Sequence, residues 1–234
     1  MDQCIILDLD NTLVKTLSSD EIKKIQETGI FDNPKYMDIR SRFYNFDLTD
    51  VDNKGNIEQE RVIGIKRPYL DEFLAYIETR FKGKVFVFTA ATRKYGNGII
   101  NSIFKREPLI LYSREQCIPN NDDQYEKPII NMITNVEGLN SIMTMGNAFI
   151  VDDRRVSLNP NPNNGILIPE YDPKPDYGSI KAGDESLLQL MSWFEKDFVK
   201  RSNDVRNLYK GDIFLTPPEL LDEMLLRNIS PDQS

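Results

Sequence analysis

Short apolar runs recur along the chain, and longer amphipathic or polar stretches separate them. Runs this short and apolar are typical of strands buried on both faces. The five predicted strands are residues 4–8, 85–89, 109–112, 148–152 and 165–168. Helices are predicted over residues 18–30, 68–77, 95–104, 187–199 and 218–226, with Pro68 in the first turn of its helix. Helices between buried strands predict a three-layer α/β fold with a mainly parallel central sheet.

A different pattern follows the first strand. Residues 44–48 and 60–65 alternate apolar and polar side chains, and the sequence DNKGN at 52–56 is typical of a turn. This pattern predicts a small β-hairpin insert around residues 44–66. The 234 residues are enough for one α/β domain with such an insert. We expect this domain over residues 1–200 and a C-terminal helical extension over residues 201–234.

The composition excludes several classes of site and partner. The protein has no histidine, which excludes histidine triads and histidine metal sites, so any hydrolytic chemistry would have to rely on carboxylates, cysteine, lysine or a metal. The formal net charge of −8 argues against direct binding of nucleic acid. Two cysteines and no apolar stretch of membrane-spanning length favour the cytoplasm or the nucleus, without a membrane partner. We expect a monomer.

Polar side chains gather where three of the predicted strands end. They are Asp8, Asp10 and Thr12 after the first strand, Thr89 at the end of the second, and Asp152 and Asp153 at the end of the fourth. In open α/β sheets, ligands bind beyond the carboxyl ends of the strands, so we expect these side chains to meet in one crevice. The alternative is a local role, because Asp, Asn and Thr also cap helices and begin turns.

The acidic pairs at these strand ends suit a divalent cation. Asp8 and Asp10 are two positions apart, so their side chains leave an extended chain on the same side and their charges repel. Mg²⁺ prefers oxygen ligands and relieves such repulsion. Asp153 adds a third candidate ligand, and Asp152 lies beside it. The sequence therefore predicts a magnesium site.

The same residues can transfer a phosphoryl group. With its charge shielded, Asp8 can attack phosphorus and form an aspartyl-phosphate, while Asp10 protonates the leaving oxygen and later activates water. Thr89 can donate its hydroxyl to the transferred group, and Lys127 can neutralise the charge on it. The alternatives are local here too, because threonine is common in strands and lysine is usually a surface residue.

Several motifs resemble one family of phosphatases. DLDNT at 8–12 matches the DxDxT signature of haloacid-dehalogenase-type phosphatases, and Thr12 is the threonine of that motif. Four further segments resemble the family that dephosphorylates the C-terminal domain of RNA polymerase II, the NLI-interacting-factor-like family. They are KRPYLDEFL at 66–74, VFTAATRKY at 87–95, LYSREQC at 111–117 and IVDDRR at 150–155. The resemblance covers roughly residues 3–200 and implies a Rossmann-like, haloacid-dehalogenase-type fold.

The resemblance also implies roles for individual residues. Asp8 would be the nucleophile and Asp10 the acid and base, and Mg²⁺ would be held by Asp8, the backbone carbonyl of Asp10 and Asp153. Thr89 and Lys127 would bind the phosphate. Two positions depart from the pattern of close or small relatives: Pro128 follows the lysine where close relatives usually have an acid, and Asp152-Asp153 stands where small members carry Asp-Asn and larger members carry two acids.

Cationic side chains fall at or beside these motifs. In an acidic protein this clustering predicts a local cationic bowl for a phosphate dianion. Its members are Lys66, Arg67, Arg93, Lys94, Arg114, Arg154 and Arg155. Arg67 could equally be a helix-start residue. By the resemblance, Arg114 lies near the substrate phosphate, and Arg93 and Tyr95 are further candidates for substrate binding.

Together these features predict a Mg²⁺-dependent protein serine/threonine phosphatase. Its partner would be a phosphoprotein, with the C-terminal domain of RNA polymerase II as a candidate, because a small insert in place of a large cap leaves the site open to a macromolecule. One alternative is a phosphatase of the same fold that acts on small molecules or nucleic-acid ends. The other is a non-catalytic binding module, which has no need for the intact motif at 8–12.

Overall fold

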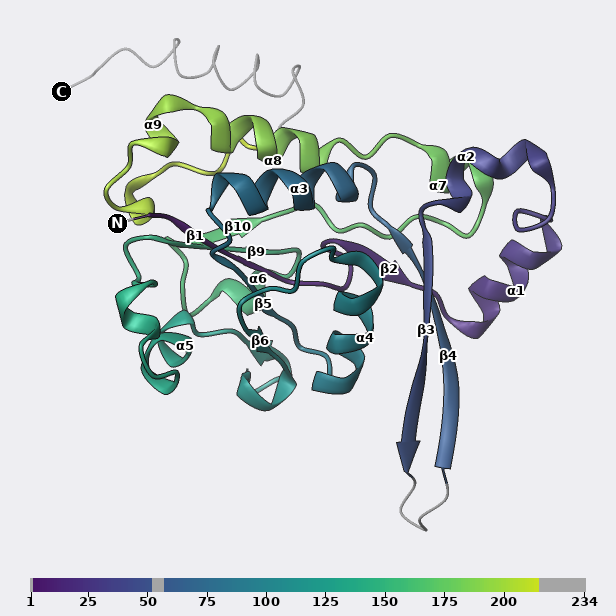
Figure 1. Cartoon of the computed structure of the whole chain (residues 1–234), viewed down its shortest axis with the longest axis horizontal. Helices are drawn as coiled ribbons and strands as arrows, with labels where there is room; N and C mark the ends of the chain where they lie inside the picture. The colour runs from purple at the N-terminus through teal and green to yellow at the C-terminus, as the bar shows by residue number, and fades with distance from the viewer. Residues whose placement is uncertain (1, 52–56, 215–234) are drawn as a thin grey trace.

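A five-stranded parallel sheet forms the centre of the computed structural model, which describes residues 2–51 and 57–214. The strand order is β10-β9-β1-β5-β6 (Figure 1). The strands are β1 (Cys4–Leu7), β5 (Val85–Phe88), β6 (Leu111–Tyr112), β9 (Ala148–Asp152) and β10 (Gly165–Leu167). Leu7 pairs with both Val87 and Val151, so β1, β5 and β9 end at the same level. The predicted α/β fold with a central parallel sheet is confirmed.

Alternate side chains of the strands reach opposite faces of the sheet, and helices cover both faces. On one face, Leu7 and Val151 pack with residues of α3, α4 and α8; on the other, Ile6 and Ile150 pack with residues of α5. Figure 1 shows α3 and α8 on one side of the sheet and α5 on the other. These helices are α3 (Leu70–Arg80), α4 (Arg93–Ile103), α5 (Ile129–Asn135) and α8 (Ser186–Glu195).

Shorter elements complete the described part of the chain. They are α1 (Ser19–Glu27), η1 (Pro34–Tyr36), α2 (Met37–Arg40), η2 (Arg114–Gln116), β7 (Ile118–Pro119), β8 (Tyr125–Glu126), η3 (Leu139–Ser141), α6 (Arg155–Leu158), α7 (Tyr177–Lys181), α9 (Asp197–Lys200) and η4 (Val205–Asn207). Beyond residue 200, Val205 and Ile213 are buried in the same core as α8. Within the described ranges, no helix has the length and apolar character needed to span a bilayer.

A small antiparallel sheet forms the predicted insert. Its strands are β2 (Val14–Thr16), β3 (Phe43–Val51) and β4 (Ile57–Lys66), with β4 in the middle, and the β3–β4 hairpin extends away from the central sheet (Figure 1). The predicted turn at 52–56 lies outside the described residues. The ring of Phe46 lies so close to α4 that a Cβ at Gly98 would be 2.3 Å from it, so glycine at this position lets the hairpin pack against the helix.

Several predicted elements have different bounds in the structure; the helix predicted over 18–30, for example, is α1 (Ser19–Glu27). The helix after Pro68 begins only at Leu70, because Tyr69 has a left-handed backbone with φ 63°. Pro68 therefore precedes the helix and does not lie in its first turn. The single helix predicted over 187–199 is divided into α8 and α9 by Lys196, whose ψ of 135° is extended. Strand β6 begins at Leu111, two residues later than predicted. The helix predicted over 218–226 lies outside the described residues.

Candidate active site at the ends of the central strands

A tight turn after β1 places the residues of the first motif. The Asp8 N–H donates to the carbonyl of Val151 at 3.0 Å, which extends the pairing of β1 with β9 by one residue. Asn11 then has a left-handed backbone with φ 58°, which asparagine tolerates better than most residues. Thr12 is completely buried, and its carbonyl accepts a hydrogen bond from the Arg67 guanidinium at 2.9 Å. The turn is therefore fixed both by the sheet and by the residue that follows β4.

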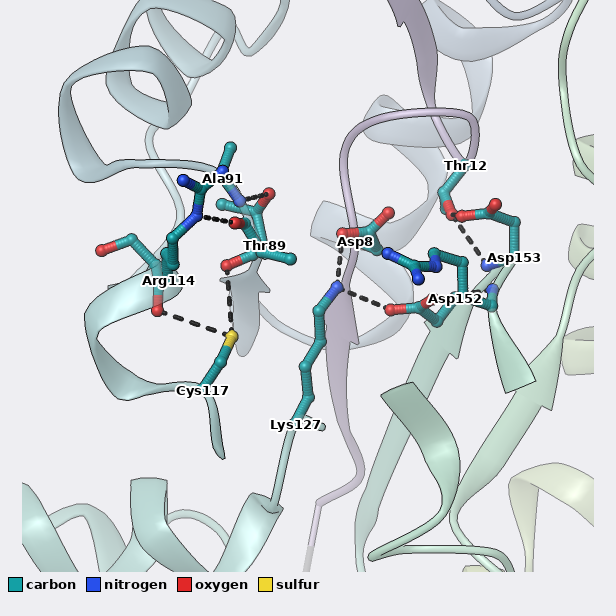
Figure 2. A network of polar contacts seen from close by, with 12 residues as sticks. Asp8, Thr12, Thr89, Ala91, Arg114, Cys117, Lys127, Asp152 and Asp153 are labelled. Carbon is teal, nitrogen blue, oxygen red and sulfur yellow. Dashed lines mark hydrogen bonds and ion pairs between the residues drawn. The ribbon is translucent and has the colours of Figure 1, made fainter. Parts of the chain in front are cut away.

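Carboxylates from β1 and β9 meet, as the strand-end argument predicted. Oxygen atoms of Asp8, Asp152 and Asp153 all lie within 4.8 Å of one another (Figure 2). Thr12 joins the two loops, because its hydroxyl donates to Asp153 Oδ1 and accepts from the Asp153 N–H, both at 3.1 Å. The carboxylate of Asp10 is not in this cluster, so only its backbone carbonyl remains as a candidate ligand from that residue.

Lys127 pairs with two members of the acidic cluster. Its ammonium donates to Asp8 Oδ1 at 2.5 Å and to Asp152 Oδ2 at 2.6 Å (Figure 2). The lysine is 1% exposed. Its backbone is held by Ser157, whose carbonyl accepts from the Lys127 N–H, and by the side-chain amide of Asn161, which donates to the Lys127 carbonyl. Lys127 is therefore not the surface lysine that was the alternative interpretation of the sequence.

The charges of the cluster suit a divalent cation. Three carboxylates face one ammonium in a buried site, which leaves two negative charges uncompensated. Burial accordingly raises the pKa of Asp8 and raises the pKa of Asp153 to about 6, since neither carboxylate is stabilised enough in its charged form. Although burial alone lowers the pKa of Lys127, the neighbouring Asp152 and Asp8 raise it and keep the lysine charged. The donor set of hard carboxylate oxygens fits Mg²⁺.

Thr89 and Arg114 lie on the opposite side of Asp8 from Asp153 (Figure 2). Thr89 is 1% exposed, and its hydroxyl oxygen accepts from the Ala91 N–H at 3.1 Å. Arg114 is tied to the same loop, because its Nε donates to the Ala90 carbonyl at 2.8 Å. Its guanidinium also lies over the ring of Tyr125, with Cζ 5.4 Å from the ring centroid. These contacts fix an arginine beside the loop that carries Thr89.

A cavity of about 450 Å³ opens over these groups. Its wall includes Leu48 of the hairpin and Ser157 of α6, neither of which was singled out from the sequence. The alternation of the hairpin predicted that Leu48 lies on one of its faces, but not which element that face meets. The lining residues are Asp8, Asp10, Asn11, Leu48, Thr89, Ala90, Ala91, Thr92, Tyr95, Arg114, Lys127, Asp153, Arg154 and Ser157.

Most of the predicted cationic bowl lies elsewhere. Arg67 is 1% exposed and forms a two-pronged ion pair with Asp184, at 3.0 and 2.8 Å. Lys66 pairs with Asp71 at 3.0 Å. Arg93, predicted to bind substrate, begins α4 but does not line the cavity. The arginines that do line it are Arg114 and Arg154. The sequence located the arginines near the motifs but could not distinguish those that face the cavity.

Tyr95 was predicted to contact a bound peptide, and the structure places it beside Asp10. Its hydroxyl donates to Asp10 Oδ1 at 2.8 Å. Asp10 is half-buried, and burial raises the pKa of its carboxyl group. A carboxyl group with a raised pKa, at the edge of the cavity, is suited to carry a proton.

Comparison with known families assigns the chain. The profile of NLI interacting factor-like phosphatases matches residues 3–206, which include every residue of the site described above. The chain belongs to this family. The resemblance inferred from the motifs is thereby confirmed. None of the curated proteins matches the chain.

Solved structures related to this NLI interacting factor-like phosphatase have the same fold. One is an arginine-to-alanine variant of the fission yeast RNA polymerase II CTD phosphatase Fcp1 bound to beryllium fluoride, with TM-score 0.51 and 17% identity. Another is Fcp1, described as an essential RNA polymerase II CTD phosphatase, with TM-score 0.50 and 14% identity. Each covers 97% of the chain, which spans only 56% and 62% of their respective lengths.

Proposed function

We propose that this phosphatase is a Mg²⁺-dependent protein serine/threonine phosphatase that acts through an aspartyl-phosphate on Asp8. The observation that carries the proposal is the cluster itself. Asp8, Asp152 and Asp153 converge, Lys127 pairs with the first two, and Asp8, Lys127 and Asp153 line one cavity together with Thr89. Carboxylates, a lysine and a threonine that are distant in the sequence meet at one edge of the sheet. This combination suits phosphoryl transfer better than a binding role.

Each residue of the site has a distinct role in the proposed reaction. Asp8 and Asp153 would hold Mg²⁺ together with the backbone carbonyl of Asp10, and Asp152 keeps Lys127 in place. When bound, Mg²⁺ shields the attacking carboxylate and withdraws charge from the phosphoryl oxygens. Lys127 stabilises the negative charge of the transferred group by its ammonium, and Thr89 is placed to donate its hydroxyl to it.

Asp8 attacks phosphorus, and the bond between phosphorus and the ester oxygen breaks. The electron pair of that bond moves to the ester oxygen, which takes a proton from Asp10. Asp10 is then a carboxylate and can remove a proton from the water that hydrolyses the aspartyl-phosphate. The same residue therefore serves both half-reactions.

A phosphoprotein substrate is favoured by the shape of the site. Among the described residues, no cap domain covers the cavity, and the hairpin and the loop at 89–92 form its walls. The solved relatives are named as phosphatases of the RNA polymerase II CTD, so repeats of that domain are the first peptides to examine. The comparison of phosphopeptides with mononucleotides and sugar phosphates separates this proposal from a small-molecule phosphatase.

The decisive experiment replaces the nucleophile. Asp8→Asn keeps the shape of the side chain but removes its charge, so it should abolish hydrolysis of p-nitrophenyl phosphate. Its melting temperature should stay near that of the wild type, because the asparagine can still accept a hydrogen bond from Lys127. EDTA should also silence the wild type, and added Mg²⁺ should restore it. Activity that persists in Asp8→Asn, or that is indifferent to chelation, would contradict the proposal.

A further inference from the structure

Three hydroxyl groups converge beside Asp10, and two of them donate to the same oxygen. Tyr95 donates to Asp10 Oδ1 at 2.8 Å, and Thr16 donates to it at 3.4 Å. The hydroxyl oxygens of Tyr95 and Thr16 lie 2.5 Å apart, and each hydroxyl has one hydrogen, which it can give either to Asp10 or to its neighbour. The hydroxyl of Tyr44 lies 3.1 Å from that of Thr16. No residue in the described ranges forms a hydrogen bond or ion pair with the other oxygen of Asp10, Oδ2.

The hydroxyls of Thr16 and Tyr44 meet across a strand. Thr16 is on β2 and Tyr44 is on β3, and β4 lies between them. Gly64 of β4 is paired with both residues. A Cβ at Gly64 would lie 2.4 Å from the phenol ring of Tyr44, so the ring passes directly over the glycine. The absence of a side chain at Gly64 therefore allows the contact between the two hydroxyls.

The arrangement is shielded from solvent. Tyr44 is 4% exposed, and Thr16 and Tyr95 are half-buried. Burial raises the pKa of Tyr44 and of Tyr95, so both phenols keep their protons and remain donors at neutral pH. In such surroundings a hydrogen bond is stronger than in water, and water cannot readily replace a lost hydroxyl.

We propose that Thr16 and Tyr44 are positioning residues for Asp10, which fix Oδ1 as a hydrogen-bond acceptor and leave the proton for the substrate on Oδ2. The inference rests on the proposed function, in which Asp10 is the acid. A proton on Oδ1 would compete with the hydroxyls of Tyr95 and Thr16 for the lone pairs of that oxygen. Oδ2 has no such competitor among the described residues. When Oδ2 gives its proton to the ester oxygen, the hydroxyls stabilise the carboxylate that remains.

The dependence of the rate on the leaving group tests this role. A p-nitrophenolate leaves without much help from an acid, whereas a phenolate requires more protonation. Phenyl phosphate and p-nitrophenyl phosphate have similar shapes, so differences in binding largely cancel when the two are compared. The quantity to measure is kcat/KM, because it reports the step in which the ester bond breaks.

Thr16→Val removes the central hydroxyl with almost no change in volume. Positioned acids contribute about 10²–10⁴-fold, so a displaced acid should cost Thr16→Val about tenfold in kcat/KM with phenyl phosphate and no more than about threefold with p-nitrophenyl phosphate. Thr16→Ser keeps the hydroxyl and should recover most of the loss. Tyr44→Phe, and Gly64→Ala which displaces the ring, should show the same selective defect to a smaller degree.

Tyr76→Phe provides the matched control. The hydroxyl of Tyr76 bonds to Glu195 at 2.8 Å, and neither residue lines the cavity, so the ratio of the two substrates should stay at its wild-type value. Equal losses on both substrates in Thr16→Val and Tyr44→Phe, or no loss in either, would overturn the inference. A wild type that hydrolyses neither substrate, or an Asp10→Asn variant without a selective loss on phenyl phosphate, would instead overturn the proposed function, and the inference with it.

Discussion

At the scale of single residues, the site contains more negative charge than the ammonium of Lys127 can compensate. Asp8 and Asp152 share one ammonium, and the charge of Asp153 is stabilised by the Thr12 hydroxyl, a backbone hydrogen bond and the more distant field of that ammonium. A buried carboxylate without full compensation is costly, and the cost falls either by protonation or by binding a cation. The stability of the protein should therefore respond to both pH and Mg²⁺.

We expect the magnesium-free protein to be more stable at pH 5 than at pH 7. The pKa of Asp153 is raised to about 6 from an ordinary value near 4, so its stabilising contribution is complete below about pH 4 and is lost as pH rises through about 6. No histidine titrates in this range. Urea unfolding at both pH values checks the expectation.

Two variations of that experiment identify the group responsible. Asp153→Asn should reduce the difference in unfolding free energy between pH 5 and pH 7, and saturating Mg²⁺ should reduce it in the wild type. A difference that is the same in Asp153→Asn as in the wild type would show that this carboxylate does not contribute.

Arg67 links three segments that are distant in the sequence. Its guanidinium donates to the carbonyls of Thr12 and Pro169 and forms the ion pair with Asp184. Because the arginine is fully buried, its removal would leave the carboxylate of Asp184 without its partner in a mostly buried place. Arg67→Met should therefore lower the free energy of unfolding by about 3–5 kcal/mol.

The neighbouring lysine is a matched control for Arg67. Lys66 forms an ion pair with Asp71, whose side chain is 53% exposed, so Lys66→Met should cost no more than about 1 kcal/mol. Urea unfolding of both variants gives the comparison. Equal losses in the two would mean that the burial of Arg67 has no energetic consequence.

At the scale of elements, the contact between β3 and α4 depends on a glycine within a helix. Ala at position 98 should favour the helix by about 1 kcal/mol, but its Cβ would lie 2.3 Å from the ring of Phe46, and overpacking costs about 1–3 kcal/mol. Gly98→Ala should therefore destabilise the protein. In a Phe46→Ala background the same change should stabilise it, as thermal unfolding can measure; the same sign in both backgrounds would contradict this account.

The elements also show which parts of the fold and the site can be predicted from the sequence. Buried parallel strands are continuous apolar runs, so all five central strands were predicted, and Asp8, Thr89 and Asp153 were located because functional groups follow strand ends. The network around Asp10 was not predicted. Thr16 and Tyr44 are ordinary strand residues in sequence, and only the register that places Gly64 between them joins their hydroxyls. Pairings between distant strands leave no local signal.

At the scale of the whole molecule, the two faces of the sheet share the same five strands. Trp193, the only tryptophan of the sequence, lies in the core on one face, where its ring packs 5.8 Å from that of Phe149 on β9. Loss of either face exposes β9, so we expect one cooperative transition. Tryptophan emission and far-ultraviolet circular dichroism should have the same midpoint in urea. Separate midpoints would mean that α8 unfolds independently of the sheet.

The position of β1 has a consequence for synthesis of the protein. This strand lies between β5 and β9, both of which leave the ribosome long after it. During translation the nascent strand therefore has no lateral partner until β5 emerges, and Asp8 has no acidic neighbours from β9 until β9 has been made. An elongating polypeptide thus lacks the assembled acidic cluster, and its apolar first strand is a natural target for chaperones.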